Sequence, residues 1–174
     1  MEESTDLFGI PVPSTDRFFL TFVVIHILIS FVCVISGFLA MLANKGGERH
    51  SISGKIYFWS MLSAFVTVVA LSIMRWPHNI HLLGIGILAA TSVYLGWRFA
   101  KKQSKKWTRP HTILMGSSYV LLLTGFYVDN GKNLPFWKLF PAWFFWIFPA
   151  AVGLPIILNV LKKHPLNRVK SDAD

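Results

Sequence analysis

Residues 18–42 read FFLTFVVIHILISFVCVISGFLAML, and this stretch decides the fold class because it contains no Asp, Glu, Lys or Arg. His26 is the one residue in it that readily gains a charge near neutral pH. An apolar run of about 18 or more residues is long enough for a helix to cross the hydrocarbon core of a bilayer. Similar stretches follow at residues 56–74, 81–100, 111–128 and 140–161. The sequence therefore predicts an all-α polytopic membrane bundle with five transmembrane helices.

The composition agrees with this class. Of the 174 residues, 53% are hydrophobic and only 14% are charged, which is unlike a soluble domain. The connections between the spans are short, so we expect one transmembrane domain at residues 18–161, an extracytoplasmic tail at 1–17 and a cytoplasmic tail at 162–174. We expect the first four spans to form a four-helix core of two hairpins. The fifth helix should be kinked, because Pro141, Pro149 and Pro155 mark it.

The net charge of +9 is distributed unevenly along the chain. One side of the predicted bundle carries the basic residues that follow the first, third and fifth spans: Lys45, Arg49, Lys55, Lys101, Lys102, Lys105, Lys106, Arg109, Lys162, Lys163, Arg168 and Lys170. The opposite side carries Arg17, Arg75, Lys132 and Lys138. The positive-inside rule therefore predicts a multi-pass protein of the cytoplasmic membrane with its amino terminus outside and its carboxy terminus in the cytoplasm.

The same distribution bears on partners. The basic residues orient the chain and contact anionic lipid headgroups, so the lipid bilayer is the first partner that we expect. Nucleic acid is not expected, because no basic segment outside the spans interleaves aromatic residues on which bases could stack.

The first span does not resemble a cleaved signal peptide, because its leading segment is acidic and its basic flank comes afterwards. The single cysteine, Cys33, permits no intrachain disulfide and no site built from several cysteines, and it reads best as a small packing residue. The absence of a Cys-x-x-Cys-His motif excludes covalent c-type haem attachment.

Ionisable residues within or beside a bilayer are functional candidates, and here they are histidines: His26, His50, His81 and His111. Small or hydroxyl residues follow His26, His81 and His111 at helical spacing, and such residues are typical of helix–helix contacts in membranes. One interpretation is that these imidazoles only form hydrogen bonds between packed helices. The other is that they converge on a ligand.

An internal sequence repeat favours the interpretation that the histidines converge on a ligand. The segment His50-Ser-Ile-Ser-Gly54-Lys-Ile-Tyr57 opens the second span after a basic loop, and His111-Thr-Ile-Leu-Met-Gly116-Ser-Ser-Tyr119 opens the fourth in the same way. The pattern suggests two helical hairpins related by an axis along the membrane normal. That relation would make His50 face His111 at the cytoplasmic boundary.

Two facing imidazoles from different helices suit b-type haem, whose iron takes two axial nitrogens. We therefore predict His50 and His111 as haem iron ligands. His26 and His81 form a weaker second pair, because His26 lies well inside its span whereas His81 begins its own. Residues expected to contribute to the haem slot are Tyr57, Trp59, Trp97 and Trp107, whereas His78 and His164 read as ordinary interfacial residues.

Other chemistries have less support. No run of inward carboxylates is visible, Asp129 being the nearest acid, which disfavours a carboxylate-bridged metal pair. No phosphate-binding loop, nucleotide fingerprint or nucleophile elbow occurs, so no catalytic residue is predicted and enzymatic activity stays open.

The leading hypothesis is a small b-type cytochrome-like electron carrier with a redox partner or quinone. The alternative is a non-enzymatic membrane component that binds or transports a lipid or small molecule, with the histidines in helix packing. Transport by so small a chain would require a homodimer to enclose a pathway.

The segment Lys45-Gly-Gly-Glu-Arg-His50-Ser-Ile-Ser-Gly54-Lys-Ile-Tyr-Phe-Trp-Ser-Met61 resembles the hallmark of a bacterial membrane protein family, domain-of-unknown-function family two-three-zero-six. Gly96-Trp97-Arg98, Val128-Asp-Asn-Gly-Lys-Asn-Leu-Pro135 and Gly153-Leu-Pro155 are also similar to segments of its members. The resemblance covers most of the chain, from about His26 to Pro165. Members commonly carry Arg directly after the loop histidine, where this chain has Ser51, so no role of that Arg carries over. The resemblance implies a bacterial cytoplasmic-membrane protein of unestablished function and does not itself imply haem.

Overall fold

The computed structural model describes residues 5–7, 10–12, 16–102 and 108–163. Two short strands, β1 (Thr5–Leu7) and β2 (Ile10–Val12), precede the helices and pair antiparallel. The helices are α1 (Arg17–Leu42), α2 (Glu48–Met74), α3 (Ile80–Lys101), α4 (Thr108–Asn130) and α5 (Phe144–Lys163). Two 3-10 turns, η2 (Gly131–Asn133) and η3 (Trp137–Leu139), join α4 to α5.

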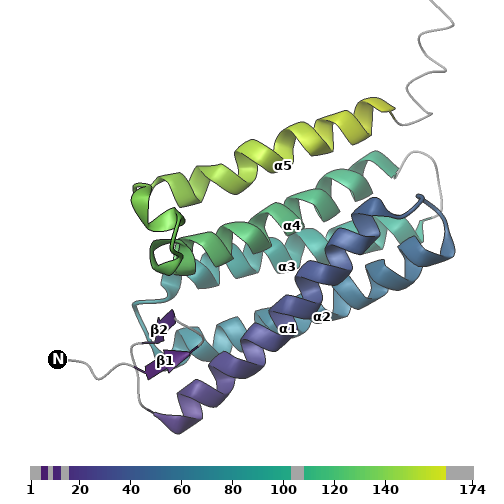
Figure 1. The fold of residues 1–174 in the computed structure, drawn as a ribbon. Coiled ribbons are helices and arrows are strands. Elements are labelled where there is room, and N and C mark those ends of the chain that lie inside the picture. Colours follow the sequence, from purple (N-terminus) through teal and green to yellow (C-terminus); the bar gives the residue numbers. More distant parts are fainter. Residues whose placement is uncertain (1–4, 8–9, 13–15, 103–107, 164–174) are drawn as a thin grey trace, which may run out of the picture.

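The bundle is helical, and five of its helices are long and apolar enough to cross a membrane, which confirms the predicted fold class. Helix α1 packs chiefly on α2, α3 packs chiefly on α4, and α5 lies against α4 (Figure 1). The chain therefore forms two antiparallel hairpins, which meet mainly through α2 and α3, and a fifth helix on the outer side of α4.

Three elements differ from the sequence prediction. Helix α2 begins at Glu48, whereas the apolar stretch in the sequence begins at residue 56. The first turns of α2 are polar, so an apolar pattern does not reveal them. Helix α5 begins at Phe144 rather than at 140, so Pro141 lies before the helix while Pro149 and Pro155 lie within it. The strands β1 and β2 lie in the segment 1–17, which was expected only as a tail.

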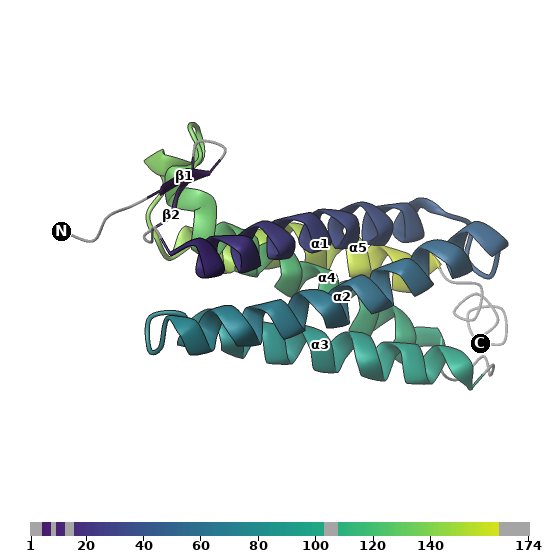
Figure 2. The ribbon, with the colours of Figure 1, turned by 90° about the horizontal axis from the view of Figure 1, so that it is seen from below.

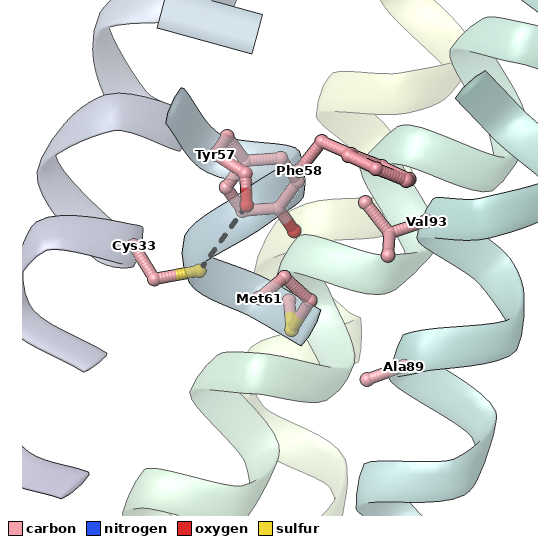
Figure 3. Packing of buried hydrophobic residues seen from close by; sticks show 6 residues of the cluster. All are labelled: Cys33, Tyr57, Phe58, Met61, Ala89 and Val93. Atoms are coloured by element: carbon pink, nitrogen blue, oxygen red, sulfur yellow. Dashed lines mark hydrogen bonds between the residues drawn. The ribbon is translucent and has the colours of Figure 1, made fainter. Parts of the chain in front are cut away.

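The centre of the bundle is a buried cluster of Cys33 on α1, Tyr57, Phe58 and Met61 on α2, and Ala89 and Val93 on α3 (Figure 3). Cys33 is fully buried, and its thiol points toward α2, where Sγ lies 3.9 Å from the carbonyl oxygen of Tyr57. The side chain is thus a packing residue, as predicted. The small side chains on α1 and α3 leave room for the aromatic rings of α2.

The helix ends divide the bundle into two unlike ends (Figures 1 and 2). The connection 43–47, the end of α3, the start of α4 and the end of α5 lie together, and we call this the basic end. Its described cations are Lys45, Arg49, Arg98, Lys101, Lys102, Arg109 and Lys162. The opposite end holds β1, β2, the turn between α2 and α3, and the η2–η3 segment.

Candidate functional site

His50 and His111 meet at the basic end, each in the first turns of its helix. Their ring centroids are 6.3 Å apart and the ring planes are inclined by 87°. Both side chains are partly buried. Helices α2 and α4 belong to different hairpins, so the packing of one hairpin on the other brings these two residues together.

Each imidazole is fixed by a hydrogen bond to the helix that precedes it. The Nδ1 of His50 lies 2.9 Å from the carbonyl oxygen of Ala40 on α1. The Nδ1 of His111 lies 2.9 Å from the carbonyl oxygen of Gly96 on α3. A carbonyl oxygen can only accept, so each Nδ1 carries the proton, and in the neutral ring Nε2 keeps a lone pair. This is the tautomer in which a histidine binds a metal through Nε2 while a backbone carbonyl orients the ring.

The two hairpins share this arrangement. In each, a histidine near the start of the second helix donates to a carbonyl near the end of the first, and the accepting residue, Ala40 or Gly96, is buried. The small acceptor residues let the imidazole approach the backbone closely. This shared arrangement supports the internal sequence repeat between the segments that begin at His50 and at His111.

Lys45 belongs to the same site. Its Nζ donates to the carbonyl oxygens of Ala40 at 3.1 Å and Met41 at 2.7 Å. The carbonyl of Ala40 therefore accepts from both Lys45 and His50. Partial burial lowers the pKa of Lys45 from its ordinary value. From the sequence, Lys45 was expected to orient the chain and to contact lipid headgroups, because a contact with a backbone carbonyl leaves no signature in a sequence.

His26 is committed to packing within the first hairpin. Its Nδ1 lies 2.8 Å from Oγ1 of Thr67, whose own hydroxyl donates to the carbonyl of Ala64 at 2.7 Å. Thr67 must then accept from His26, so Nδ1–H is the donor and Nε2 accepts from the hydroxyl of Ser30 at 3.3 Å. Both ring nitrogens are occupied, and neither is left for a metal.

His81 lies in the first turn of α3 at the opposite end, exposed, with its ring 6.3 Å from that of Trp146. The described ring contacts do not join it to His26, so the structure does not bring the weaker second pair together as it does His50 and His111. His78 is exposed in the turn before α3, and His164 lies outside the described residues.

The aromatic residues expected around the haem have different surroundings. Tyr57 is buried in the core, where its hydroxyl lies 2.8 Å from Oγ of Ser118. Trp97 stacks on Phe58 with centroids 4.7 Å apart, and Trp59 is exposed. The fourth residue of that prediction, Trp107, lies outside the described residues.

Within the described ranges, no group of three or more His, Cys, Asp or Glu side chains is placed to hold a metal ion. The ligand set that the site can offer is thus the pair of Nε2 atoms of His50 and His111. A pair suits an ion whose remaining positions are filled by another molecule, as in haem, where the porphyrin supplies the equatorial nitrogens and the protein the axial ones.

No protein-family model, curated protein or solved structure matches this chain. The resemblance to domain-of-unknown-function family two-three-zero-six therefore stays a prediction, and the case for function rests on the geometry of the site.

Proposed function

We propose that this chain is a small b-type cytochrome-like electron carrier of the membrane, with His50 and His111 as axial ligands of one haem. The observation that carries the proposal is the pairing of two imidazoles from different hairpins, each held by its Nδ1–H on a backbone carbonyl. In the neutral rings this leaves two Nε2 lone pairs at one place in the bundle.

The spacing fits the ligand set. An imidazole nitrogen binds a first-row metal at about 2 Å, so two imidazoles on opposite sides of one ion have ring centres about 6 Å apart. The observed separation is 6.3 Å. The planes at 87° are compatible with axial ligation, because each ring can rotate about its own metal–nitrogen bond. Haem bound there would supply a one-electron couple, while the protein holds the ligands and surrounds the group with apolar helices.

The setting of the proposed haem follows from the charges. By the positive-inside rule the basic end lies in the cytoplasm, so the haem would sit near the cytoplasmic surface with the amino terminus outside. We further propose a bacterial cytoplasmic membrane, in line with the resemblance to domain-of-unknown-function family two-three-zero-six. Electrons would pass to or from a quinone or a protein partner that reaches this end.

An absorption spectrum tests the proposal. The chain is expressed with haem supply, purified in detergent and recorded before and after dithionite reduction. We expect a b-type reduced-minus-oxidised α-band that is lost in His50→Ala and in His111→Ala. The matched control is His78→Ala, since His78 is exposed in a turn and should leave the band unchanged. A colourless wild-type protein that is folded and takes up no added haem would overturn the proposal.

The second candidate is a non-enzymatic component that binds a lipid or small molecule, with the histidines in helix packing. The bonds of His26 to Thr67 and Ser30 favour it, because they show one membrane histidine in that role. A shallow groove on the face of α1 and α2 could take such a ligand; its lining residues are Ile29, Val32, Lys55, Ile56, Trp59, Ser60 and Ser63. A transport role would additionally need a homodimer, and light scattering of the detergent-solubilised protein measures that state directly.

A further inference from the structure

The geometry at the basic end points to one more residue with a role toward the proposed ligand. Resting on the function proposed above, we infer that Lys45 provides the positive charge that holds the propionate carboxylates of a haem bound by His50 and His111. Haem b carries two such carboxylates, which make it anionic at its edge. Lys45 is thus a residue that selects a carboxylate-bearing porphyrin.

The position of Lys45 supports this role. Its Nζ and the Nδ1 of His50 converge on the same carbonyl oxygen, that of Ala40, at 3.1 and 2.9 Å. The ammonium therefore shares an acceptor with one of the two proposed axial ligands, on the Nδ1 side of the His50 ring. The bonds to Ala40 and Met41 also anchor it on the last turn of α1, so little side-chain freedom would be lost when an anion binds.

The donor count of Lys45 supports the same role. An ammonium has three N–H donors, and two of them bond to the carbonyls of Ala40 and Met41. One donor and the whole positive charge remain for a carboxylate. A bond between an ammonium and a carboxylate is charge-assisted and stronger than a bond between neutral groups.

Two other cations of the basic end, Lys101 and Arg98, and the nearby Lys55 on α2 have different contacts. Lys101 lies 3.8 Å from the ring centroid of Trp97, and Arg98 bonds to the hydroxyl of Tyr94 at 3.2 Å, so both interact with aromatic rings of their own helix α3. Lys55 lines the groove with Ile56 and Trp59. Among the described lysine and arginine contacts, those of Lys45 are the ones that reach the acceptor of a proposed ligand.

A binding cycle tests the inference with two ligands and two proteins. The ligands are haem and haem dimethyl ester, whose propionates are uncharged, and the proteins are the wild type and Lys45→Met. Each dissociation constant is measured by absorption titration of the apoprotein in detergent. We expect the wild type to bind haem about tenfold more tightly than the ester, the range typical of one charge-assisted bond, and Lys45→Met to bind both ligands about equally.

The controls separate this role from helix capping. Lys45→Arg keeps the charge and the donors and should keep the preference for haem, while Lys55→Met removes a charge on α2 and should also keep it. If Lys45 only caps α1, Lys45→Met weakens both ligands by the same factor and the preference survives, which overturns the inference while leaving the haem site intact. If the wild type binds neither ligand through two histidines, the proposed function falls and the inference falls with it.

Discussion

The histidines differ in how many of their ring nitrogens form hydrogen bonds within the fold. His26 has both nitrogens engaged, by Thr67 and Ser30. In His50 and His111, the described hydrogen bonds involve Nδ1 alone, which donates to a backbone carbonyl. Sequence position alone cannot make this distinction, because all three residues lie in spans or at their ends and are followed by small or hydroxyl residues.

The first prediction concerns His26. His26→Ala should lower the free energy of unfolding by about 1 kcal/mol, since two interhelical or local hydrogen bonds are lost in a setting where each is worth about 0.6 kcal/mol. It should leave unchanged the haem band that the proposed function predicts for the wild type. Reversible unfolding in mixed detergent–dodecyl sulfate micelles measures the stability. Loss of the band at unchanged stability would instead make His26 a ligand.

The second prediction concerns the two core tyrosines. The hydroxyl of Ser118 donates to the carbonyl of Met115, so the buried hydroxyl of Tyr57 must donate to Ser118. Tyr57→Phe should cost about 1 kcal/mol by the same micelle assay, because a fully desolvated bond is lost. Tyr119→Phe should cost less, because its hydroxyl is only partly buried and donates to the carbonyl of Val34 at 3.2 Å. Equal costs would mean that burial of the bond does not matter here.

Helix α1 of the first hairpin contacts α4 of the second hairpin at Gly37. A Cβ built on Gly37 would lie 2.7 Å from the ring of Tyr119 on α4 and 2.8 Å from that of Tyr57 on α2. The two rings contact each other with centroids 6.1 Å apart. The absence of a side chain at Gly37 therefore lets one helix of the first hairpin reach the second hairpin, the small-residue packing that membrane helices use.

The third prediction follows from this contact. Gly37→Ala should destabilise the fold by about 1–3 kcal/mol, since the rings must shift to admit the methyl group. Its control is Gly84→Ala on α3, where nothing lies within 4 Å of the added Cβ. That variant should be neutral or slightly stabilising, because alanine favours helix by up to about 1 kcal/mol. Thermal unfolding followed by circular dichroism compares the two, and equal melting temperatures for both variants would contradict the packing account.

The sequence predicted the elements well where apolar length decides them and poorly elsewhere. Hydropathy located the five helices, because a bilayer requires apolar length regardless of packing. It missed the first turns of α2, which are polar yet helical, and the strands β1 and β2, which are too short to leave a pattern. It also began the last helix too early, since Phe140 and Trp143 are as hydrophobic as the helix that follows.

Across the whole bundle, the internal sequence repeat was the most useful signal for the site. It led to the predicted pairing of His50 with His111, whose ring centroids are 6.3 Å apart in the structure. It could not show the carbonyls of Ala40 and Gly96 or the position of Lys45, because backbone acceptors are the same for every residue type. The depth mismatch noted for His26 and His81 was also informative, since the structure gives these two residues different partners.

The fourth prediction concerns the orientation of the molecule, on which the cytoplasmic location of the proposed haem depends. Single cysteines are introduced at Asn44, in the connection 43–47, and at Asn133, in η2, on a Cys33→Ala background. Both asparagines are exposed and uncharged, so neither substitution alters the charge distribution that orients the chain. The background change removes a thiol that is fully buried, and it keeps a small residue in the core.

In intact bacterial cells, a membrane-impermeant maleimide should label Asn133→Cys and should label Asn44→Cys only after permeabilisation. The physical reason is the imbalance of Lys and Arg between the ends, which makes translocation of the basic end costly. Labelling of Asn44→Cys in intact cells, with Asn133→Cys protected, would place the His50–His111 pair at the outer surface. A haem held there would then exchange electrons with extracytoplasmic partners, and Lys45 would face the periplasmic solution rather than the cytoplasm.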